Sequence, residues 1–285
     1  MQNILESVHF LFESVFTSVC PSVRIFFSNL ALVLKKVGRE NTDTHSLLPN
    51  PKTGTQFKLC LAVGVLRALN ARRVLDISAG WGDRLLANLA CGVERYVATD
   101  PNTTLRPTHD RIIADFCGKN TKATVIYEPF EKAKLPEGEM FDTVFTSPPF
   151  FDFEIYVPRG HADERNQSIS KSQGNFESWM AGWLFPALRK AWSRLKPGGH
   201  MAIHITDVSK CVVCEPMCLF MQAYLKNSIY AGCIGSIGEA RKARPIWVFR
   251  KMSTTEQELP ENSRLRNRAH KILNGRYYRA MRYYR

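Results

Sequence analysis

Short apolar runs alternate with amphipathic stretches along most of the chain, beginning near residue 56. Apolar runs of this kind, bounded by turn residues, are typical of buried strands, whereas apolar positions spaced by three and four indicate helices. Strands are predicted over 73–76, 96–99, 123–127, 141–146, 199–206, 229–234 and 245–250. Helices are predicted over 56–69, 84–90, 106–116, 175–195 and 216–226. This alternation predicts an α/β fold, with a mostly parallel, doubly wound sheet of seven strands and helices on both faces.

The segments on either side of this pattern have a different character. The first 36 residues are rich in phenylalanine, but glutamates interrupt them, so we expect no secretory signal. No run of about twenty uncharged apolar residues is present, so no membrane span is expected either. One or two amphipathic helices packed on the core are predicted there, with a membrane-surface or partner helix as the alternative. We therefore expect an N-terminal helical extension and connector over 1–50, a main domain over 51–252 and a basic C-terminal tail over 253–285.

Positive charge is concentrated at the end of the chain. The formal net charge is +13, and residues 241–285 carry thirteen Lys and Arg against three Glu. A surplus of this size favours an anionic partner such as nucleic acid or an acidic membrane. From Arg264 onward, arginines that can bind phosphates are interleaved with tyrosines that can stack on bases, although a solvated basic tail would have the same composition. The eight cysteines lack the paired spacing of a small secreted scaffold, which indicates a reduced, intracellular protein.

A glycine-rich turn follows the first predicted strand. Gly80 and Gly82 allow a sharp turn after Asp76, so a ligand can approach the main chain and the start of the next helix. Asp100 ends the second strand, where an acidic residue typically accepts hydrogen bonds from ribose hydroxyls. Residues 127–130, after the third strand, can flank an adenine ring. The cofactor-site candidates are Asp76, Ser78, Ala79, Gly80, Gly82, Asp100, Pro101, Glu128, Pro129 and Phe130. By themselves these residues indicate an adenosine-containing cofactor, either a nicotinamide dinucleotide or S-adenosylmethionine.

The most specific feature is the tetrapeptide Ser147-Pro148-Pro149-Phe150 after the fourth strand. Two prolines make a rigid turn without free N–H groups, so the Ser147 hydroxyl and the Pro148 carbonyl can point together into a cleft. An exocyclic amine of a base is a poor nucleophile, and two acceptors that hold its hydrogens would aim its lone pair at a methyl donor. Phe150 can stack on a base drawn out of its helix or single strand. These four residues are the predicted catalytic site, and an ordinary loop with two prolines is the alternative.

In these two motifs the sequence resembles the class I amino-methyltransferases, specifically the DNA cytosine-N4 and adenine-N6 enzymes. That family has a Gly-rich turn followed by a tetrapeptide of Ser, Asp or Asn, then Pro-Pro, then Tyr or Phe. The segment 195–199 is similar to the approach to the fifth strand of this fold, and 245–251 to the terminal strand of some cytosine-N4 enzymes. The resemblance covers roughly 53–251 and implies a Rossmann-like fold and S-adenosyl-L-methionine as cofactor. Ser78 stands where many members have their first glycine, and no long target-recognition domain is visible.

The resemblance implies methylation of an exocyclic amino group of a nucleic-acid base, with DNA favoured over RNA. Ser147 favours cytosine N4, because cytosine enzymes of the family usually have Ser there. An RNA adenosine N6 enzyme, a catalytically silent nucleic-acid-binding subunit and a protein glutamine methyltransferase are the other possibilities. Cys211, Cys214 and Cys218 have a spacing that a metal site could use, but a second tight pair is missing, so we expect no metal.

Overall fold

The structure is a computed structural model that describes residues 56–151, 156–157, 160–166, 174–207, 211–237 and 243–281. The chain divides into two compact units, Met1–Gly54 and Thr55–Arg285, and all the described residues belong to the second. The helices predicted in the first 50 residues, and the last residues of the basic segment, 282–285, lie outside the described residues.

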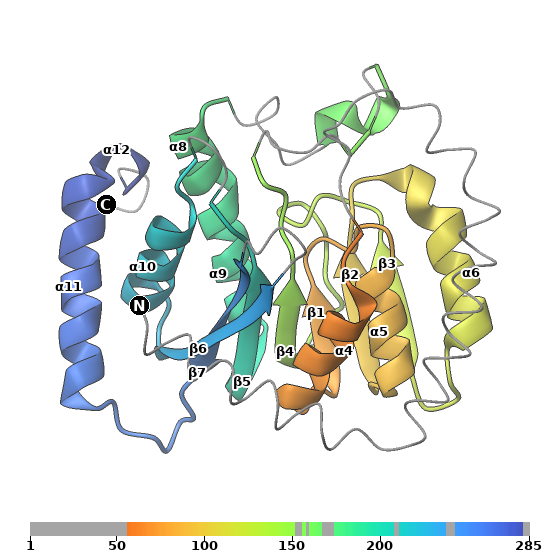
Figure 1. Cartoon of the computed structure of the whole chain (residues 1–285), viewed down its shortest axis with the longest axis horizontal. Helices are drawn as coiled ribbons and strands as arrows, with labels where there is room; N and C mark the ends of the chain where they lie inside the picture. The colour runs from red at the N-terminus through yellow and green to blue at the C-terminus, as the bar shows by residue number, and fades with distance from the viewer. Residues whose placement is uncertain are drawn as a thin grey trace. The chain divides into compact units, whose positions relative to one another are not determined.

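Seven strands form one sheet in the order β3-β2-β1-β4-β5-β7-β6 (Figure 1). The strands are β1 (Arg73–Asp76), β2 (Arg95–Thr99), β3 (Lys122–Ile126), β4 (Phe141–Thr146), β5 (Leu195–His204), β6 (Ser228–Ile237) and β7 (Ala243–Lys251). Strands β1 to β5 pair in parallel, and β7 is antiparallel to both β5 and β6. A parallel sheet with a single antiparallel strand at this place is the Rossmann-like class I methyltransferase fold. The predicted fold class is therefore confirmed.

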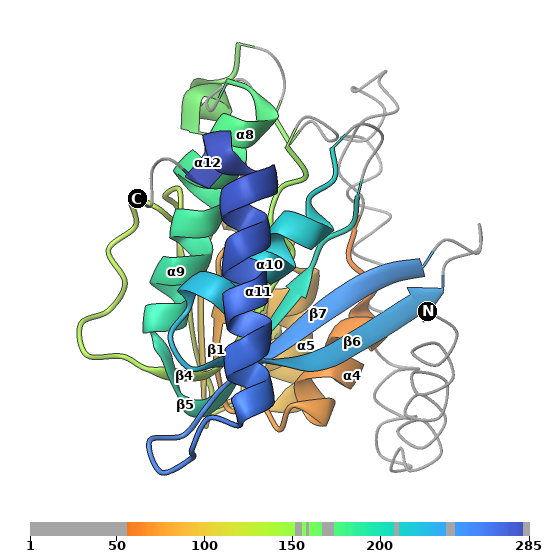
Figure 2. The same cartoon turned by 90° about the vertical axis from the view of Figure 1, so that its left-hand side faces the viewer.

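Helices cover both faces of the sheet. The described helices are α4 (Leu59–Ala68), α5 (Asp83–Cys91), α6 (Arg106–Phe116), α8 (Phe176–Trp179), α9 (Phe185–Ser193), α10 (Cys214–Tyr224), α11 (Pro260–Arg276) and α12 (Tyr278–Met281). Figure 2 shows α8 and α9 on one side of the sheet, α4 and α5 on the other, and α11 outermost. Because β1 to β5 are parallel, their carboxyl ends lie at the same edge of the sheet. Ligands of such folds bind at this edge.

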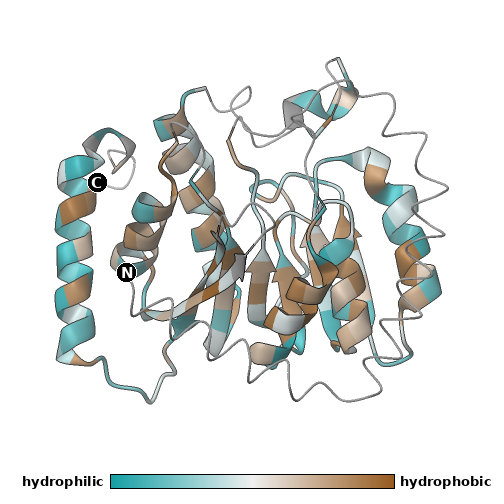
Figure 3. Cartoon of the chain, in the orientation of Figure 1, coloured by the Kyte–Doolittle hydropathy of each residue, from teal (hydrophilic) through white to brown (hydrophobic). Residues whose placement is uncertain are grey.

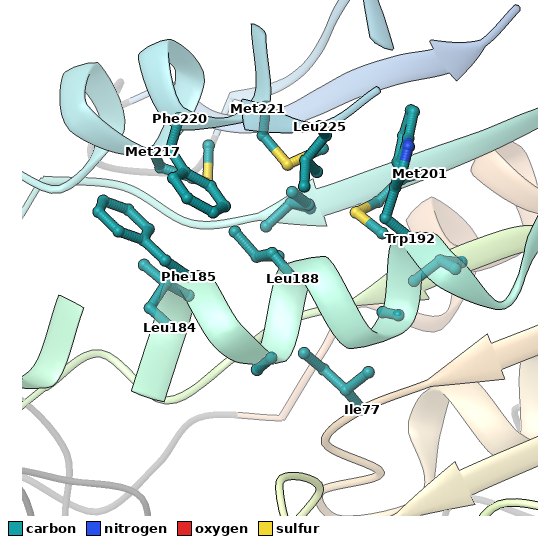
Figure 4. Packing of buried hydrophobic residues seen from close by; sticks show 14 of the residues in the cluster. Ile77, Leu184, Phe185, Leu188, Trp192, Met201, Met217, Phe220, Met221 and Leu225 are labelled. Atoms are coloured by element: carbon teal, nitrogen blue, oxygen red, sulfur yellow. The ribbon is translucent and has the colours of Figure 1, made fainter. Parts of the chain in front are cut away.

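The largest hydrophobic cluster lies between α9, α10 and the sheet. Phe185 and Leu188 of α9 face Phe220 and Met221 of α10, and the rings of Phe185 and Phe220 stack with centroids 4.2 Å apart (Figure 4). All four side chains are buried. A π-helical turn, Met180–Leu184, joins α8 to α9. A single α-helix was predicted over 175–195, and the extra residue per turn is invisible to a pattern that assumes the α-helical period.

The segment predicted as a basic tail is helical over α11 and α12 and packs onto α10. Ala269, Leu273 and Met281 are buried, whereas the outer side of α11 is hydrophilic (Figure 3). The short apolar stripe explains the difference, because residues four apart fall on one face of a helix and can dock there even in a strongly charged segment. The described part of the segment is thus a docked helix rather than an appendage, and the boundary at residue 252 stays a prediction.

Candidate active site

Gly80 and Gly82 form the turn between β1 and α5 for two different reasons. Both have positive φ values, +59° and +99°. A Cβ on Gly82 would lie 2.7 Å from Cδ1 of Ile112 and 3.3 Å from His109 on α6, so these side chains would have to shift to admit one. A Cβ on Gly80 would meet nothing nearer than the Ser78 carbonyl at 4.0 Å. Gly80 is therefore demanded by its backbone conformation alone, and the space above it is open to a ligand.

Asp76 lies beneath this turn and is fully buried. Its four acceptor positions are all used: Arg84 donates from Nε at 2.8 Å and from Nη2 at 3.3 Å, the Tyr96 hydroxyl donates at 3.2 Å, and the Ser78 N–H donates at 3.1 Å. Arg84 also donates to the Ser78 carbonyl. Although burial opposes its charge, the Asp76 carboxylate raises the pKa of Arg84.

This saturation changes the role expected for Asp76. It was predicted to contact the cofactor, but no acceptor position on its carboxylate is left for one. Its place in the structure is that of a support, which fixes the backbone of the turn through Arg84 and the Ser78 N–H. The pairing was not predicted because Arg84 comes from α5, and its contact with the end of β1 cannot be deduced from a strand pattern.

Asp100, at the end of β2, is held differently. It is 7% exposed, and its carboxylate accepts only two backbone hydrogen bonds among the described residues, from Gly80 at 2.8 Å and from Asn102 at 2.9 Å. Burial raises the pKa of Asp100 to about 6, although the two N–H donors act in the opposite direction. Two acceptor positions therefore remain beside the open side of the glycine turn, which is what a pair of ribose hydroxyls requires.

Three further residues predicted to contact the cofactor, Ser78, Ala79 and Pro101, differ in their burial and hydrogen bonding. Ala79 is buried and donates its N–H to the Thr99 carbonyl at 2.8 Å. The Ser78 hydroxyl is buried and has no hydrogen-bond partner among the described residues. Pro101 is half-buried next to Asp100. An unpaired buried hydroxyl costs about 1–3 kcal/mol, so the turn fits a polar ligand that would satisfy it.

The residues after β3 differ in their exposure. Glu128 is exposed and Pro129 is buried. Phe130 is 2% exposed within the hydrophobic core, and the ammonium of Lys190 lies 4.8 Å from the centre of its ring. A ring enclosed in this way offers no face to an adenine, so the structure does not support Phe130 as a cofactor contact. The other aromatic residue of 127–130, Tyr127, is half-buried.

His109, which the sequence analysis did not single out, connects Tyr127 to the turn. Its Nε2 lies 2.8 Å from the Gly80 carbonyl and its Nδ1 lies 3.0 Å from the Tyr127 hydroxyl. Since a carbonyl only accepts, Nε2 carries the proton and Nδ1 accepts the Tyr127 hydroxyl. Burial lowers the pKa of His109, which agrees with a neutral ring. The guanidinium of Arg106 lies 4.3 Å from the centre of the Tyr127 ring. His109 and Arg106 therefore hold Tyr127 in place, and His109 connects it to the glycine turn.

The predicted catalytic tetrapeptide follows β4, the neighbour of β1 in the sheet. Ser147 is half-buried, and its Oγ lies 3.1 Å from Nδ1 of His204, the last residue of β5. Pro148 is buried and Pro149 is half-buried. The half-buried ring of Phe150 stands edge-on to the His204 ring, with centroids 6.3 Å apart. The tetrapeptide thus lies at the strand end nearest the glycine turn, as predicted, and its hydroxyl is held by a residue the sequence analysis missed.

The side chains of the consecutive residues Phe150 and Phe151 lie in different surroundings. Phe151 has a φ of +47°, a left-handed conformation that is strained for a large side chain. Its buried ring packs against Phe176 and Trp179, with centroids 5.5 and 5.8 Å away. The strained turn therefore sends Phe151 into the core and leaves Phe150 beside Ser147.

Phe57, just before α4, connects the two turns. Its ring stands edge-on to His204 and Phe145, with centroids 5.0 and 5.7 Å away. The Phe57 N–H donates to the carboxylate of Asp83 at 3.3 Å, and the guanidinium of Arg84 lies 5.4 Å from the centre of the Phe57 ring. Burial raises the pKa of Asp83. Phe57 therefore touches residues of the β1 turn and of the β4 and β5 ends at once.

Part of the long loop after the tetrapeptide is anchored over the β2 end. Asp163, in a short 3₁₀ helix (Ala162–Asn166), accepts hydrogen bonds from the N–H and the hydroxyl of Thr103 at 2.8 and 2.7 Å. Thr103 follows Asp100 by three residues. The described part of the segment after the tetrapeptide is thus joined at Asp163 to Thr103, close to the predicted ribose site.

The described residues contain no group of three or more His, Cys, Asp or Glu side chains arranged to hold a metal ion. Burial raises the pKa of the Cys214 thiol to about 12 and that of Cys218 well above its usual value. Both side chains are therefore neutral thiols near neutral pH. Within the same residues no helix is long and apolar enough to cross a membrane.

The outer side of α11 carries the largest block of unpaired cations described on one helix. Arg264, Arg268 and Lys271 are exposed and form no ion pair within the described part of the chain, whereas Arg266 pairs with Glu258 and Arg276 with Glu215. Spacings of four and three place the unpaired side chains on one face. They span about 10 Å along the helix, and we call them the α11 basic face.

No family model matches the sequence, and no curated protein sequence matches it either. Among solved structures, the chain is similar to the N-methyltransferase NodS from Bradyrhizobium japonicum WM9, with 12% identity, 68% of this chain and 93% of that one covered, and a TM-score of 0.48. It is also similar to TrmN from Thermus thermophilus, with 18% identity, 69% and 49% covered, and a TM-score of 0.47. Magnesium protoporphyrin IX methyltransferase from Synechocystis PCC 6803 with bound SAM has 12% identity, 67% and 77% covered, and a TM-score of 0.46. At this level of similarity, the fold assignment rests on the strand order of the sheet itself.

Proposed function

We propose that this chain is an S-adenosylmethionine-dependent methyltransferase that acts on an exocyclic amino group of a nucleic-acid base. The observation that carries the proposal is the placement of the Ser147–Phe150 tetrapeptide at the end of β4, directly beside the strand that leads into the glycine turn. In a parallel sheet the ends of neighbouring strands share one edge, so a ligand over the turn and a second ligand at Ser147 would lie side by side.

The proposed cofactor contacts follow from the atoms that the turn leaves available. Asp100 would accept the ribose hydroxyls with its two remaining acceptor positions, and the backbone of Gly80 would allow close approach. Tyr127 and Glu128 would lie beside the adenine, and the unpaired Ser78 hydroxyl would gain a partner. When bound, the cofactor supplies an electrophilic methyl group.

In the acceptor site the protein would hold the amine rather than transform it chemically. The Ser147 hydroxyl and the Pro148 carbonyl would accept the two amine hydrogens, and the Phe150 ring would stack on the base. Because the amine nitrogen becomes acidic once a methyl group is attached, its proton can leave without a strong base. Positioning therefore accounts for most of the proposed catalysis.

The α11 basic face supports a nucleic-acid substrate. Three unpaired cations on one helix face can contact successive phosphates without reading base edges. We favour DNA, with cytosine N4 or adenine N6 as the target, because Ser147 and the terminal strand resemble those enzymes. RNA adenosine N6 is the alternative that the same experiment distinguishes.

The test is transfer of a labelled methyl group from S-adenosylmethionine to DNA and to RNA, followed by mass spectrometry of the nucleosides. We expect N4-methylcytosine or N6-methyladenine from DNA, and a roughly 100- to 1,000-fold lower turnover in Ser147→Ala, as when one oriented hydrogen-bonding group is lost from an active site. Ser193→Ala is the matched control, because that hydroxyl is exposed and bonds only to the carbonyl of Lys190 in its own helix. N6-methyladenosine from RNA alone would select the alternative. Full activity of Ser147→Ala would contradict the proposed site.

A further inference from the structure

The hydroxyl of Ser147 has one proton and two lone pairs. To accept a hydrogen from a substrate amine, it must direct its own proton away from the substrate. If the proton pointed into the site, it would face the nitrogen lone pair that has to attack the methyl group. The role proposed for Ser147 therefore requires a neighbouring acceptor that holds this proton in one direction.

His204 provides an acceptor at the required place. Its Nδ1 lies 3.1 Å from Ser147 Oγ, within hydrogen-bonding range. In a neutral imidazole only one nitrogen carries a proton, so with the proton on Nε2 the Nδ1 atom accepts the Ser147 hydroxyl. No other hydrogen bond of the Ser147 side chain is found among the described residues.

The surroundings of His204 restrict the orientation of its ring. The residue is 8% exposed and ends β5, opposite Ile246 of β7. The rings of Phe57 and Phe150 stand edge-on to the imidazole, at angles of 81° and 78°. A ring enclosed in this way keeps Nδ1 directed at Ser147, and the same enclosure joins it to the ring proposed to stack on the base.

We infer that His204 is a positioning residue that accepts the Ser147 proton and so turns the Ser147 lone pairs toward the target amine. The inference rests on the proposed function and adds a residue to it. No covalent step is assigned to His204: the Oγ–H bond stays intact, and the hydrogen bond to Nδ1 decides only its direction. The consequence is that Ser147 and His204 act as one unit.

The test is a double-mutant cycle on methyl transfer. His204→Phe keeps an aromatic ring against Phe57 and Phe150 but removes Nδ1, and we expect kcat to fall roughly 10- to 100-fold, since small losses of alignment have effects of that size. Cofactor affinity and KM should stay close to the wild-type values. In the Ser147→Ala background the same substitution should have no further effect on kcat, because residues that act as a unit are not additive. His204→Asn, which returns an acceptor to the position, should recover part of the activity.

His200→Phe is the matched control, because it removes a histidine four residues earlier on the same strand and away from Ser147. Independent losses in Ser147→Ala and His204→Phe that multiply in the double variant would overturn the inference and leave a packing role. Full activity of His204→Phe with a loss in Ser147→Ala would also overturn it without touching the proposed function. Full activity of Ser147→Ala would instead contradict the proposed function itself.

A second readout does not depend on turnover or on knowing the substrate. In protein labelled with ¹⁵N-histidine, the Nδ1 resonance of His204 should report an unprotonated nitrogen that accepts a hydrogen bond. Its chemical shift should move in Ser147→Ala and stay unchanged in Ser193→Ala. A resonance that shows a proton on Nδ1, or one that is identical in wild type and Ser147→Ala, would contradict the proposed direction of the bond.

Discussion

The turn after β1 and the turn after β4 lie at the ends of neighbouring strands but are held in place by different forces. Beneath the first turn, a buried carboxylate and guanidinium are paired, and every acceptor position of Asp76 is used. At the second turn, a hydrogen bond joins Ser147 to His204, another joins the Phe150 N–H to the Tyr156 hydroxyl, and aromatic rings surround His204.

This difference matches the two ligands we propose. A buried ion pair with complementary hydrogen bonds holds a backbone in one geometry, which suits a turn that must bring main-chain atoms close to a cofactor. A site for a flat, neutral base requires ring faces and polar groups without net charge, because an unpaired buried charge would oppose its entry. The sheet therefore separates a charge-stabilised half from an aromatic half along one edge.

The largest effect expected is on the charge-stabilised half. Arg84→Met leaves the Asp76 carboxylate buried without its cation and should lower the free energy of unfolding by about 3–5 kcal/mol. Chemical denaturation measures it. Arg111→Met removes an exposed ion pair with Asp115 and should cost less than about 1 kcal/mol. Equal destabilisation by the two substitutions would show that the pair does not hold the turn, and a double variant with Asp76→Asn should lose less than the sum of the single effects.

The next effect concerns Asp100, whose carboxylate has two acceptor positions left among the described residues. Asp100→Asn should weaken S-adenosylmethionine binding by about 1.5–3 kcal/mol through loss of charge-assisted hydrogen bonds. Since the pKa of Asp100 is raised to about 6, the wild-type affinity should rise as the pH increases through about 6 and the carboxylate ionises. Calorimetry between pH 5 and 8 should show this step in the wild type and not in Asp100→Asn. The same step in both proteins would assign it to another group.

The raised pKa of Asp100 also fixes the sign of its effect on folding without a ligand. The folded protein holds the proton of Asp100 more tightly than the unfolded chain does. This contribution to stability is therefore fully present at pH values below the ordinary carboxyl pKa, and it is lost as the pH rises toward about 6. Asp100→Asn should remove that part of the pH dependence from denaturation curves. An unchanged dependence would mean that the carboxyl titrates at its ordinary value.

Substitutions of Phe150 and Phe151 test the aromatic half, at the turn after β4. Phe150→Ala should lower kcat/KM by an amount equivalent to about 1–3 kcal/mol of stacking and change the free energy of unfolding little, since the ring is half-buried. Phe151→Ala should do the reverse and destabilise the fold, because its ring is buried against Phe176 and Trp179. Kinetics and denaturation on both variants separate the two roles. A purely structural effect of Phe150→Ala would remove it from the acceptor site.

The smallest effect per residue is expected outside both halves, on the α11 basic face. Replacing Arg264, Arg268 and Lys271 by Gln should reduce the slope of log affinity against log salt by roughly 2–3, whatever the base sequence. Cofactor binding and stability should not change. Replacing the exposed Lys119, Lys122 and Lys132 by Gln removes the same charge elsewhere. An equal change in both triple variants would mean that net charge, rather than this face, attracts nucleic acid.

Local sequence signals predicted the elements and the strand ends closely. The helix predicted over 106–116 and the strand over 141–146 have the same bounds in the structure. Both are marked by residues whose effect is local, such as the proline in the first turn of α6 and the prolines after β4. The positions of Asp100 and Ser147 could be predicted for the same reason, because in a parallel sheet the chemistry follows the strands.

The contacts that give those residues their roles could not be predicted in this way. His204 lies 57 residues from Ser147, and Phe57 lies 26 residues from Asp83. His204 does end a strand, so the rule that led to Asp100 could have found it, whereas nothing in the sequence around Phe57 marks it. The burial of Phe130 could not be predicted either, because an aromatic residue after a strand looks the same whether its ring faces a ligand or the core.

The sequence by itself determined the order of the strands, the glycine turn and the proline tetrapeptide, since periodicity and the φ requirements of Gly and Pro act over a few residues. The tertiary structure alone decided which polar atoms remain available. Asp76 and Asp100 lie at the ends of neighbouring parallel strands. Arg84 helps to occupy every acceptor position of the Asp76 carboxylate, whereas the Asp100 carboxylate accepts two backbone N–H groups and keeps two positions available. Hydrogen-bonding capacity is used up by neighbours in space, and those neighbours are fixed only when the sheet and its helices have packed.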